Sequence, residues 1–254
     1  MASRGEQRRE SRGSGGPNMS GFYWVLGAVA VLGIAAVGYS VASNSLGTAA
    51  TEPVEVAGLD NMETLVAAAQ GITKGDPDAP ITIVEFADYQ CPACGSFALT
   101  VKPQIDLLLV QTGKAKFVYY DFPLISIHAH TFLASRAGRC ANDQGRFWEF
   151  QDIIFRNQST WAAKDQVLGD FLDYGEQAGA DRETFEACVK SDKHADVVTA
   201  NMRLGEELGI DGTPTIMVSQ GRGMARRLNI FDFESIRAVV EGLLAESDSV
   251  PSAP

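Results

Sequence analysis

Two cysteines separated by two residues, Cys91 and Cys94, are the side chains of this sequence whose type and spacing most clearly indicate chemistry. Thiols this close together can form a disulfide and be reduced again, so the pair can exchange electrons with other thiols. The pair follows an apolar run typical of a strand and opens a run typical of a helix. A cysteine at the first turn of a helix lies near unpaired backbone N–H groups and the positive end of the helix dipole, which favour the thiolate.

The thiolate is the attacking species in disulfide exchange, so Cys91 is the predicted nucleophile and Cys94 the shielded, resolving partner. A zinc site would need two more ligands at short spacing, and His128, His130 and Cys140 form no such second pair. A purely structural disulfide is disfavoured, because so small a ring removes little entropy from the unfolded chain. We therefore predict no metal and no cofactor other than the redox-active pair itself.

The elements that position this pair follow from the apolar periodicity. Strands are predicted at residues 81–87, 116–122 and 215–219, with a helix from residue 97 that Pro103 is expected to kink. A helix between the first two strands favours a parallel β-α-β unit with a right-handed crossover. Residues 127–208 hold helical patterns and no convincing strand, so a helical insertion interrupts the sheet; Asp181 and Asp192 are expected to cap two of its helices. A hairpin at 225–230 and a helix at 233–245 complete the fold.

The N-terminal region predicts a membrane segment. The stretch from Phe22 to Tyr39 contains 18 consecutive, mostly apolar residues, which can just cross a bilayer. The tail before it holds four arginines and two glutamates, and that arginine excess predicts a cytoplasmic N-terminus with the rest of the chain outside. A single-pass anchor is favoured over a signal peptide, because the run exceeds the usual apolar core of about 7 to 15 residues. Small residues around Ala42 and Ala49 permit cleavage, which would make the protein secreted or periplasmic.

The charge of the chain restricts its partners. The whole chain has a formal net charge of −11 and the N-terminal tail has a net charge of +2, which leaves a net charge of −13 on the exported part. So acidic a surface argues against nucleic acid or an anionic lipid surface as a partner, and solubility explains it. Four cysteines in an exported protein agree with an oxidising compartment.

Three motifs in order carry a resemblance to a known family. They are EFADYQCPAC at residues 85–94, GRFWEF at 145–150 and GTPT at 212–215. Together they resemble the DsbA-like thiol-disulfide oxidoreductases of the thioredoxin superfamily, most of all the membrane-anchored bacterial type of the BdbD group. The resemblance covers roughly residues 75–245, and the joint occurrence of the motifs is specific where a lone C-x-x-C is not.

The resemblance implies an α/β thioredoxin fold with an inserted α-helical subdomain, preceded by one N-terminal transmembrane helix. The expected parts are a cytoplasmic tail (1–20), a transmembrane anchor or signal segment (21–43), a linker with a weakly helical patch (44–74), the first part of the thioredoxin fold (75–126), the helical insertion (127–208), the second part of the thioredoxin fold (209–246) and a disordered tail (247–254).

The resemblance also implies that the Thr213–Pro214 peptide bond is cis, which proline makes inexpensive. The cis turn would expose the backbone of Thr213 to pair with an extended substrate segment beside Cys91, with Pro92 and Ala93 next to it. From the residues alone, an ordinary turn proline at the start of a strand is the simpler interpretation of Pro214, and the resemblance reverses that order.

Glu85 interrupts an apolar run in a predicted central strand. A carboxylate there must be paired, solvated or protonated with a raised pKa. The resemblance implies a buried acid that assists proton transfer at the resolving cysteine, and the alternative is a surface glutamate facing the edge of the sheet. Cys140 and Cys188 fall in the insertion, where we expect a second, structural disulfide that closes a loop of about 49 residues. Two free buried thiols are the alternative.

The expected activity is that of a monomeric extracytoplasmic dithiol oxidase that introduces disulfides into exported, cysteine-containing proteins. The resemblance implies reoxidation by a quinone-linked membrane partner of the DsbB or VKOR type. A disulfide isomerase or reductase is the alternative within redox chemistry. A membrane-tethered binding or holdase module without catalysis is the alternative from another class, and replacing Cys91 by serine would distinguish it.

Overall fold

A computed structural model describes residues 50–221, 223–229 and 231–248, together with residues 29, 31, 33 and 34. Those four residues are helical, and the rest of the predicted membrane segment lies outside the described residues. The predicted C-terminal tail also lies outside them from residue 249 onward. The chain from Ala49 onward forms one compact unit, which contains all of the elements below.

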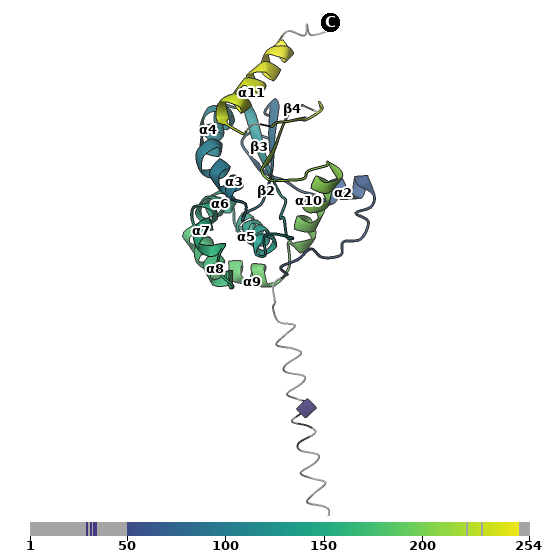
Figure 1. Cartoon of the computed structure of the whole chain (residues 1–254), viewed down its shortest axis with the longest axis vertical. Helices are drawn as coiled ribbons and strands as arrows, with labels where there is room; N and C mark the ends of the chain where they lie inside the picture. The colour runs from purple at the N-terminus through teal and green to yellow at the C-terminus, as the bar shows by residue number, and fades with distance from the viewer. Residues whose placement is uncertain are drawn as a thin grey trace, which may run out of the picture. The chain divides into compact units, whose positions relative to one another are not determined.

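The described residues contain a five-stranded mixed sheet at the centre of this unit (Figure 1). The strands are β1 (Ile72–Lys74), β2 (Ile81–Ala87), β3 (Ala115–Asp121), β4 (Thr215–Gln220) and β5 (Arg226–Arg227). Their order is β1-β3-β2-β4-β5, with β2 and β3 parallel, as predicted, and the other neighbours antiparallel. The strand that leads into the cysteine pair, β2, is therefore flanked on both sides.

The segment 44–74, expected to be a linker, adds elements to the fold. Its helical patch is α2 (Met62–Ala68), which Asn61 caps by accepting a hydrogen bond from the backbone N–H of Thr64 at 3.0 Å. Strand β1 was not predicted, and it pairs with β3 to form one edge of the sheet. A strand of three residues offers too little alternation for a sequence pattern to detect.

Alternate residues of the strands supply two separate cores, because successive side chains in a strand point to opposite faces. The first core lies under the helical run after the cysteine pair and under α11 (Phe233–Asp248), and it includes Ile81, Ile83, Phe117, Tyr119, Ile105, Leu109, Ile236 and Val240. The second core lies under α2 and α10 (Ala195–Glu207), and it includes Leu65, Phe86, Phe122 and Leu204. Glu85 follows Ile83 by two residues, so it lies on the face of the first core.

One continuous helical run follows the cysteine pair. It consists of α3 (Pro92–Ser96), the π-helical segment η1 (Phe97–Val101), α4 (Lys102–Ile105) and the π-helical segment η2 (Asp106–Val110). Pro103 lies inside α4, and the backbone accommodates it between two wider turns without ending the helix. Among the described residues this run is long and apolar enough to cross a membrane, but it packs on the sheet as a core helix.

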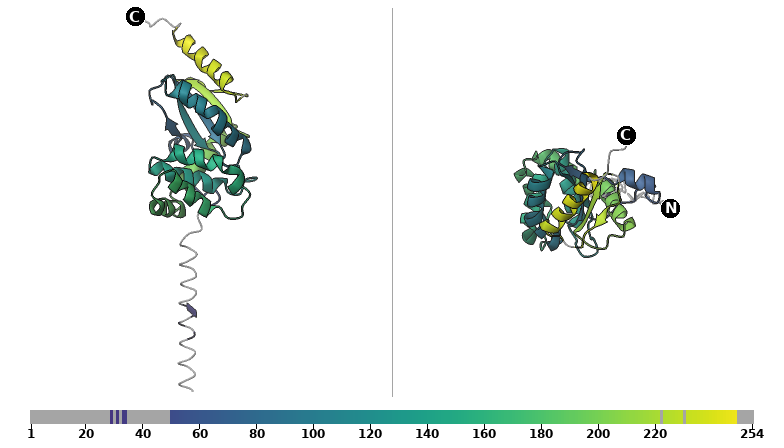
Figure 2. Two further views of the ribbon diagram at one scale, coloured as in Figure 1. Left: turned by 90° about the vertical axis from the view of Figure 1, so that its left-hand side faces the viewer. Right: turned by 90° about the horizontal axis from the view of Figure 1, so that it is seen from above.

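The insertion is helical, as predicted. Its helices are α5 (Thr131–Asp143), α6 (Phe147–Arg156), α7 (Gln158–Trp161), α8 (Leu168–Gln177), α9 (Arg182–Lys190) and α10. Figure 2 shows α5 to α9 gathered at one end of the sheet and α11 at the other. Their buried aromatic side chains, among them Phe150, Trp161 and Phe171, belong to the first core, so insertion and sheet share one interior. The chain thus has a thioredoxin fold with an inserted helical subdomain.

The two predicted helix caps in the insertion have different outcomes. Asp181 caps α9 and accepts a hydrogen bond from the backbone N–H of Thr184 at 2.9 Å. The prediction for Asp192 was wrong, because α10 begins only after His194. Instead, the carboxylate of Asp192 pairs with the buried Arg136 at 2.6 Å and accepts the backbone N–H of Ala50 at 2.7 Å. Asp192 therefore holds the segment before α2 against the insertion.

Candidate active site

The cysteine pair lies where β2 gives way to the helical run. Cys91 is the N-cap of α3, and Pro92 occupies the first helical position, where no backbone N–H is required. The backbone N–H of Gly95 donates to the carbonyl of Cys91 at 3.1 Å and closes the first turn. Both thiols are free in the structure, so it represents the reduced pair.

The two sulfurs differ in exposure. Cys94 is fully buried, whereas Cys91 retains 9% of its surface, and Pro92 and Ala93 between them are exposed. A partner thiol approaching from solvent therefore meets Cys91 first. The expected division into an attacking and a shielded cysteine agrees with this placement.

The environment of Cys91 favours its thiolate. A hydrogen bond from the Cys94 thiol is the largest of the influences that lower the pKa of Cys91 to about 5; burial opposes it, and the backbone N–H groups of Cys94 and Ala93 act in the same direction as the thiol. The Thr213 side chain also lowers this pKa. Its hydroxyl oxygen is buried and has no hydrogen-bond partner among the described residues, so it acts on the sulfur through its dipole. The helix N-terminus thus contributes, but the neighbouring thiol contributes more.

The turn before β4 lies against the exposed sulfur. The Cys91 sulfur lies 3.3 Å from the carbonyl oxygen of Thr213, and the Thr213–Pro214 peptide bond is cis, as the family resemblance implies. This contact arises because β4 lies next to β2 in the sheet, with Phe86 opposite Thr215.

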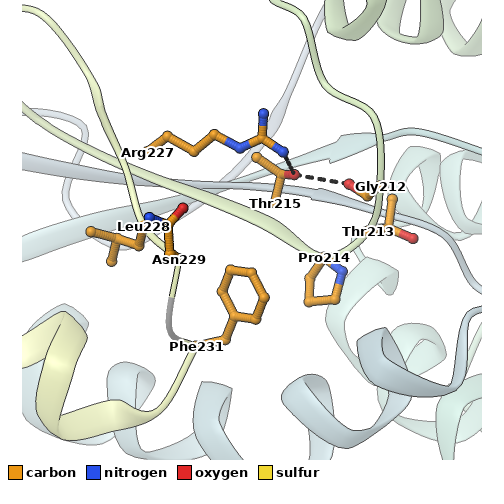
Figure 3. A pocket seen from close by; sticks show the side chains of 8 residues that line it. All are labelled: Gly212, Thr213, Pro214, Thr215, Arg227, Leu228, Asn229 and Phe231. Carbon is orange, nitrogen blue, oxygen red and sulfur yellow. Dashed lines mark hydrogen bonds between the residues drawn. The ribbon is translucent and has the colours of Figure 1, made fainter.

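A pocket of about 260 Å³ opens beside this turn (Figure 3). It is lined by Gly212, Thr213, Pro214, Thr215, Arg227, Leu228, Asn229 and Phe231. Figure 3 shows the rings of Pro214 and Phe231 near each other, whereas Arg227 reaches the hydroxyl of Thr215 at 3.4 Å. The pocket therefore combines apolar rings with the backbone of the turn next to a reactive sulfur.

Glu85 is buried in the sheet and is not a surface residue. Neither of its carboxyl oxygens has a hydrogen-bond partner among the described residues. Burial raises the pKa of Glu85 to about 8, although the positive charge of Lys102 opposes the shift. A pKa in that range favours the protonated carboxyl group at neutral pH, which is one of the three states expected of an acid in an apolar strand.

The positive charge near Glu85 comes from the helical run. Lys102 is 2% exposed, forms an ion pair with Asp106 at 2.9 Å and lies 4.6 Å from the centre of the Trp148 ring. Asp106 also forms an ion pair with Lys74 at 2.7 Å. Because Lys74 is partly exposed, this group of charged side chains extends from the core to the surface. Sequence analysis did not single out Lys102, because a lysine in a helix is usually solvated.

The surroundings of Cys94 shift its pKa in the direction opposite to that of Cys91. Burial raises the pKa of Cys94 well above its ordinary value, and the hydrogen bond to Cys91 and the charge of Glu85 act in the same direction. The backbone N–H of Asp88 lies 3.5 Å from the Cys94 sulfur and lowers this pKa. The reduced pair therefore consists of a thiolate at Cys91 and a thiol at Cys94.

Asp88 is a site residue that the sequence analysis missed. Its fully buried carboxylate accepts four hydrogen bonds, from the backbone N–H groups of Gln90 (2.6 Å) and Leu124 (2.8 Å), the hydroxyl of Thr131 (2.5 Å) and Nδ1 of His128 (2.8 Å). The usable signal in the sequence was an aspartate between apolar residues at the end of a strand. Its partners could not be foreseen, because three of them lie in a segment about 36 to 43 residues later.

The insertion also holds the turn that carries Cys91. The Gln158 amide of α7 donates to the carbonyls of Tyr89 at 2.7 Å and Cys91 at 2.9 Å. The Gln90 side chain donates to the carbonyl of Ala162 at 3.2 Å and accepts the backbone N–H of His130 at 2.8 Å. The helical subdomain thus fixes the active-site turn from outside the sheet.

Cys140 on α5 and Cys188 on α9 form a disulfide with an S–S distance of 2.04 Å. It joins two helices of the insertion, away from the redox pair. Among the described residues, one group of potential metal ligands combines these two sulfurs with His194. Sulfurs bonded to each other are not thiolates, and thiolates are the form of cysteine that binds metal.

A family model described as Thioredoxin matches residues 67–235, which include both redox cysteines, Thr213 and Pro214. The chain is 29% identical over 175 residues to the Na(+)/H(+) antiporter NhaA 3 of Salinispora tropica, with 68% of this chain and 25% of the antiporter covered. It is 26% identical over 171 residues to the probable disulfide bond formation protein D of Bacillus cereus, with 66% of this chain and 76% of that protein covered.

The oxidised crystal structure of BdbD from Bacillus subtilis is similar to the chain with a TM-score of 0.61 and 25% sequence identity. The match covers 70% of this chain and 97% of BdbD. The chain thus spans only a quarter of the antiporter that it matches, but nearly the whole of the solved relative.

Proposed function

This chain belongs to the thioredoxin family, as a DsbA-like member of the BdbD type, and on that premise we propose that it is an extracytoplasmic dithiol oxidase that introduces disulfides into exported proteins. In this function Cys91 and Cys94 form the disulfide that is donated. The substrate lies on a surface formed by Pro92, Ala93, Thr213 and Pro214. Glu85 donates a proton to the Cys94 sulfur and accepts it in the reverse step.

The observation that carries this proposal is the difference between the two thiols. The hydrogen bond from Cys94 holds the pKa of Cys91 at about 5, while burial raises that of Cys94. A stabilised thiolate favours the reduced pair over its disulfide, and a disulfide whose reduced form is stabilised is a strong oxidant. Electrons are therefore expected to flow from substrate thiols to the pair.

The exchange takes two steps. A substrate thiolate attacks Sγ of Cys91, a new S–S bond forms, and the Cys91–Cys94 bond breaks with its electron pair on Cys94. A second substrate thiolate then attacks the substrate sulfur of this mixed disulfide and expels Cys91 as the thiolate. The substrate loses two electrons and gains one disulfide, and the cysteine pair gains two electrons. Cys91 is the better leaving group because its thiolate is stabilised.

Glu85 supplies the proton for the buried sulfur. Burial keeps the pKa of Glu85 near 8, so at neutral pH its carboxyl group carries a proton that the departing Cys94 thiolate can accept through an intervening water molecule. The reverse transfer would activate Cys94 when the pair is reoxidised. A group whose pKa lies near the working pH suits both directions.

The substrate would lie across the cis turn. The carbonyl of Thr213 faces Cys91, so an extended peptide can pair with this backbone as an added strand and bring its cysteine to the sulfur. The pocket beside Pro214 and Phe231 is suited to an apolar side chain of that peptide.

Reoxidation requires an acceptor of two electrons, for which we propose a quinone-linked membrane partner of the DsbB or VKOR type. The predicted N-terminal anchor would hold both proteins in the same membrane, with the catalytic unit outside the cytoplasm. The Cys140–Cys188 disulfide supports that location, because such bonds persist in oxidising compartments.

The reduction potential of the Cys91–Cys94 pair in the full chain tests the direction of electron flow. A value near about −120 mV, the range of strongly oxidising relatives, supports an oxidase. A value near about −270 mV would instead identify a reductant, and one near about −180 mV would favour an isomerase. Equilibration with defined glutathione buffers, followed by alkylation and mass measurement, gives the number.

Replacing Cys91 by serine separates catalysis from binding. An oxidase loses all transfer of disulfides to a reduced substrate, whereas a tethered binding or holdase module keeps its activity. The proposed function includes no transport, because the region that matches this chain is a quarter of the antiporter.

A further inference from the structure

We propose that Asp88 is a positioning residue for disulfide exchange, and that His128 and Thr131 of the helical insertion hold it so that its backbone N–H meets the sulfur of Cys94. This inference rests on the proposed function, since it concerns the sulfur that leaves when the disulfide opens.

Asp88 contacts both redox cysteines through its backbone. Its N–H lies 3.5 Å from Sγ of Cys94, within the distance of a hydrogen bond to sulfur. Its carbonyl accepts the backbone N–H of Cys91 at 3.2 Å. A rotation of the peptide groups around Asp88 would therefore change the donor at one sulfur and the orientation of the turn that carries the other.

The carboxylate of Asp88 prevents such a rotation. Oδ1 accepts from Gln90 within the same turn and from the hydroxyl of Thr131, and Oδ2 accepts from the N–H of Leu124 and from His128. Because a carboxylate accepts hydrogen bonds, Nδ1 of His128 must carry the proton in this contact. Two of the four donors, Leu124 and His128, lie in the segment that connects β3 to α5, and Thr131 is the first residue of α5, so the start of the insertion fixes the orientation of Asp88.

These four bonds also reduce the effect of the negative charge of Asp88 on Cys94. A buried negative charge beside Cys94 would oppose the formation of a second anion there. Both oxygens of Asp88 are paired with N–H or O–H donors, which disperses that charge toward the connecting segment. The group that remains directed at the Cys94 sulfur is the N–H, and its dipole favours a thiolate.

The N–H acts when the disulfide opens. As the substrate sulfur bonds to Cys91, the Cys91–Cys94 bond breaks and Cys94 receives the electron pair in a fully buried position. A hydrogen bond to an ionised group is stronger than one to a neutral group, so the contact stabilises the leaving thiolate more than it stabilises the starting disulfide. Such a contact lowers the barrier of the step.

The test measures how fast a small thiol opens the disulfide. The full chain is oxidised, mixed with reduced glutathione at constant pH, quenched with acid and alkylated, and the opened fraction is read by mass. Thr131→Val and His128→Leu each remove one donor to Asp88. Thr131→Ser and His128→Asn are the matched controls, since serine keeps the hydroxyl and the asparagine Nδ2 can replace Nδ1.

We expect the disulfide to open about tenfold more slowly in the double variant T131V/H128L, which corresponds to the loss of one hydrogen bond to a charged group. The double control T131S/H128N should retain most of the wild-type rate. The alkylation profile of Cys91 against pH should stay in place in the reduced double variant, because none of the groups that set it is altered. His128 is partly exposed, so the single variant H128L provides the same readout if the double variant does not fold.

Equal opening rates in the wild-type chain and in folded variants would overturn the proposal. A slower opening rate together with a shift of the Cys91 alkylation profile along the pH axis would also overturn it, because the two changes together indicate general loosening of the site. Failure of the proposed function looks different: the wild-type chain itself would then open slowly or have a reducing potential.

Discussion

The thiol of Cys91 lies 3.3 Å from the backbone carbonyl oxygen of Thr213, although 122 positions separate the two residues in the sequence. The contact joins the start of the helical run to the turn before β4, which are neighbours because β2 and β4 pair in the sheet. In the proposed function, an extended substrate that pairs with Thr213 would therefore pass the reactive sulfur. The chemistry depends on a sheet contact as much as on the cysteine spacing.

Replacing Cys94 by alanine should raise the pKa of Cys91 above its value of about 5, because the thiol of Cys94 is the largest influence that lowers it. The rate of alkylation by iodoacetamide, followed against pH, measures this value in the full chain. The serine variant at Cys94 is the control, since its hydroxyl can still donate, and its midpoint should lie between those of the wild-type and alanine chains. An unchanged midpoint in the alanine variant would show that the Cys94 thiol does not set this pKa.

Replacing Thr213 by valine should also raise the pKa of Cys91, because valine keeps the shape of the side chain and removes the hydroxyl that favours the thiolate. A less stable thiolate makes the pair less oxidising, so the reduction potential should fall by up to about 30 mV, the equivalent of a tenfold change in the exchange equilibrium. Thr213→Ser is the control and should keep the wild-type potential. A potential that rises in the valine variant would contradict the role given to the hydroxyl.

Glu85→Gln should stabilise the chain at neutral pH. Burial raises the pKa of Glu85 from 4.5 to about 8 in the folded state, so the folded chain binds this proton more tightly than the unfolded chain does. The free energy of unfolding of the wild-type chain therefore decreases as pH rises from about 4.5 to about 8, whereas glutamine does not titrate. The variant should gain on the order of 1–3 kcal/mol at pH 7 and nothing near pH 4.

Urea unfolding at both pH values measures this difference, with the cysteine pair in the same redox state throughout. A variant equally stabilised at pH 4 and pH 7 would indicate a packing effect and not the titration of Glu85. Destabilisation at pH 7 would show that the carboxyl group is ionised and paired in the folded chain.

Removing the Cys140–Cys188 disulfide by a double alanine substitution should destabilise the chain by about 4 kcal/mol, since the bond restricts a long loop of the unfolded chain. The sequence separation of the two cysteines is 48. Urea unfolding measures the loss, and the rate at which reduced glutathione opens the Cys91–Cys94 bond is the control. That rate should be unchanged, because this disulfide joins α5 to α9 whereas the redox pair lies at the start of α3; a slower rate would assign the bond a part in the exchange.

The sequence was sufficient wherever the determining interactions are local. The C-x-x-C spacing, the proline at the first helical position and the strand before it fix how Cys91 and Cys94 are presented, because a strand, a short turn and a helix start involve only neighbouring residues. The apolar run likewise placed Glu85 in a strand, β2, whereas only the structure showed that its carboxyl group is buried. The helical insertion followed from the apolar spacing of its long segments.

The tertiary structure alone decided which distant groups meet the two sulfurs. Sequence spacing does not reveal that His128 and Thr131 hold Asp88, that Lys102 is buried against Trp148, or that Gln158 clamps the turn before Cys91. Nor does it show that Cys94 outweighs the helix terminus in setting the state of Cys91. These outcomes depend on desolvation and on contacts across tens of residues, which exist only after the insertion has packed against the end of the sheet.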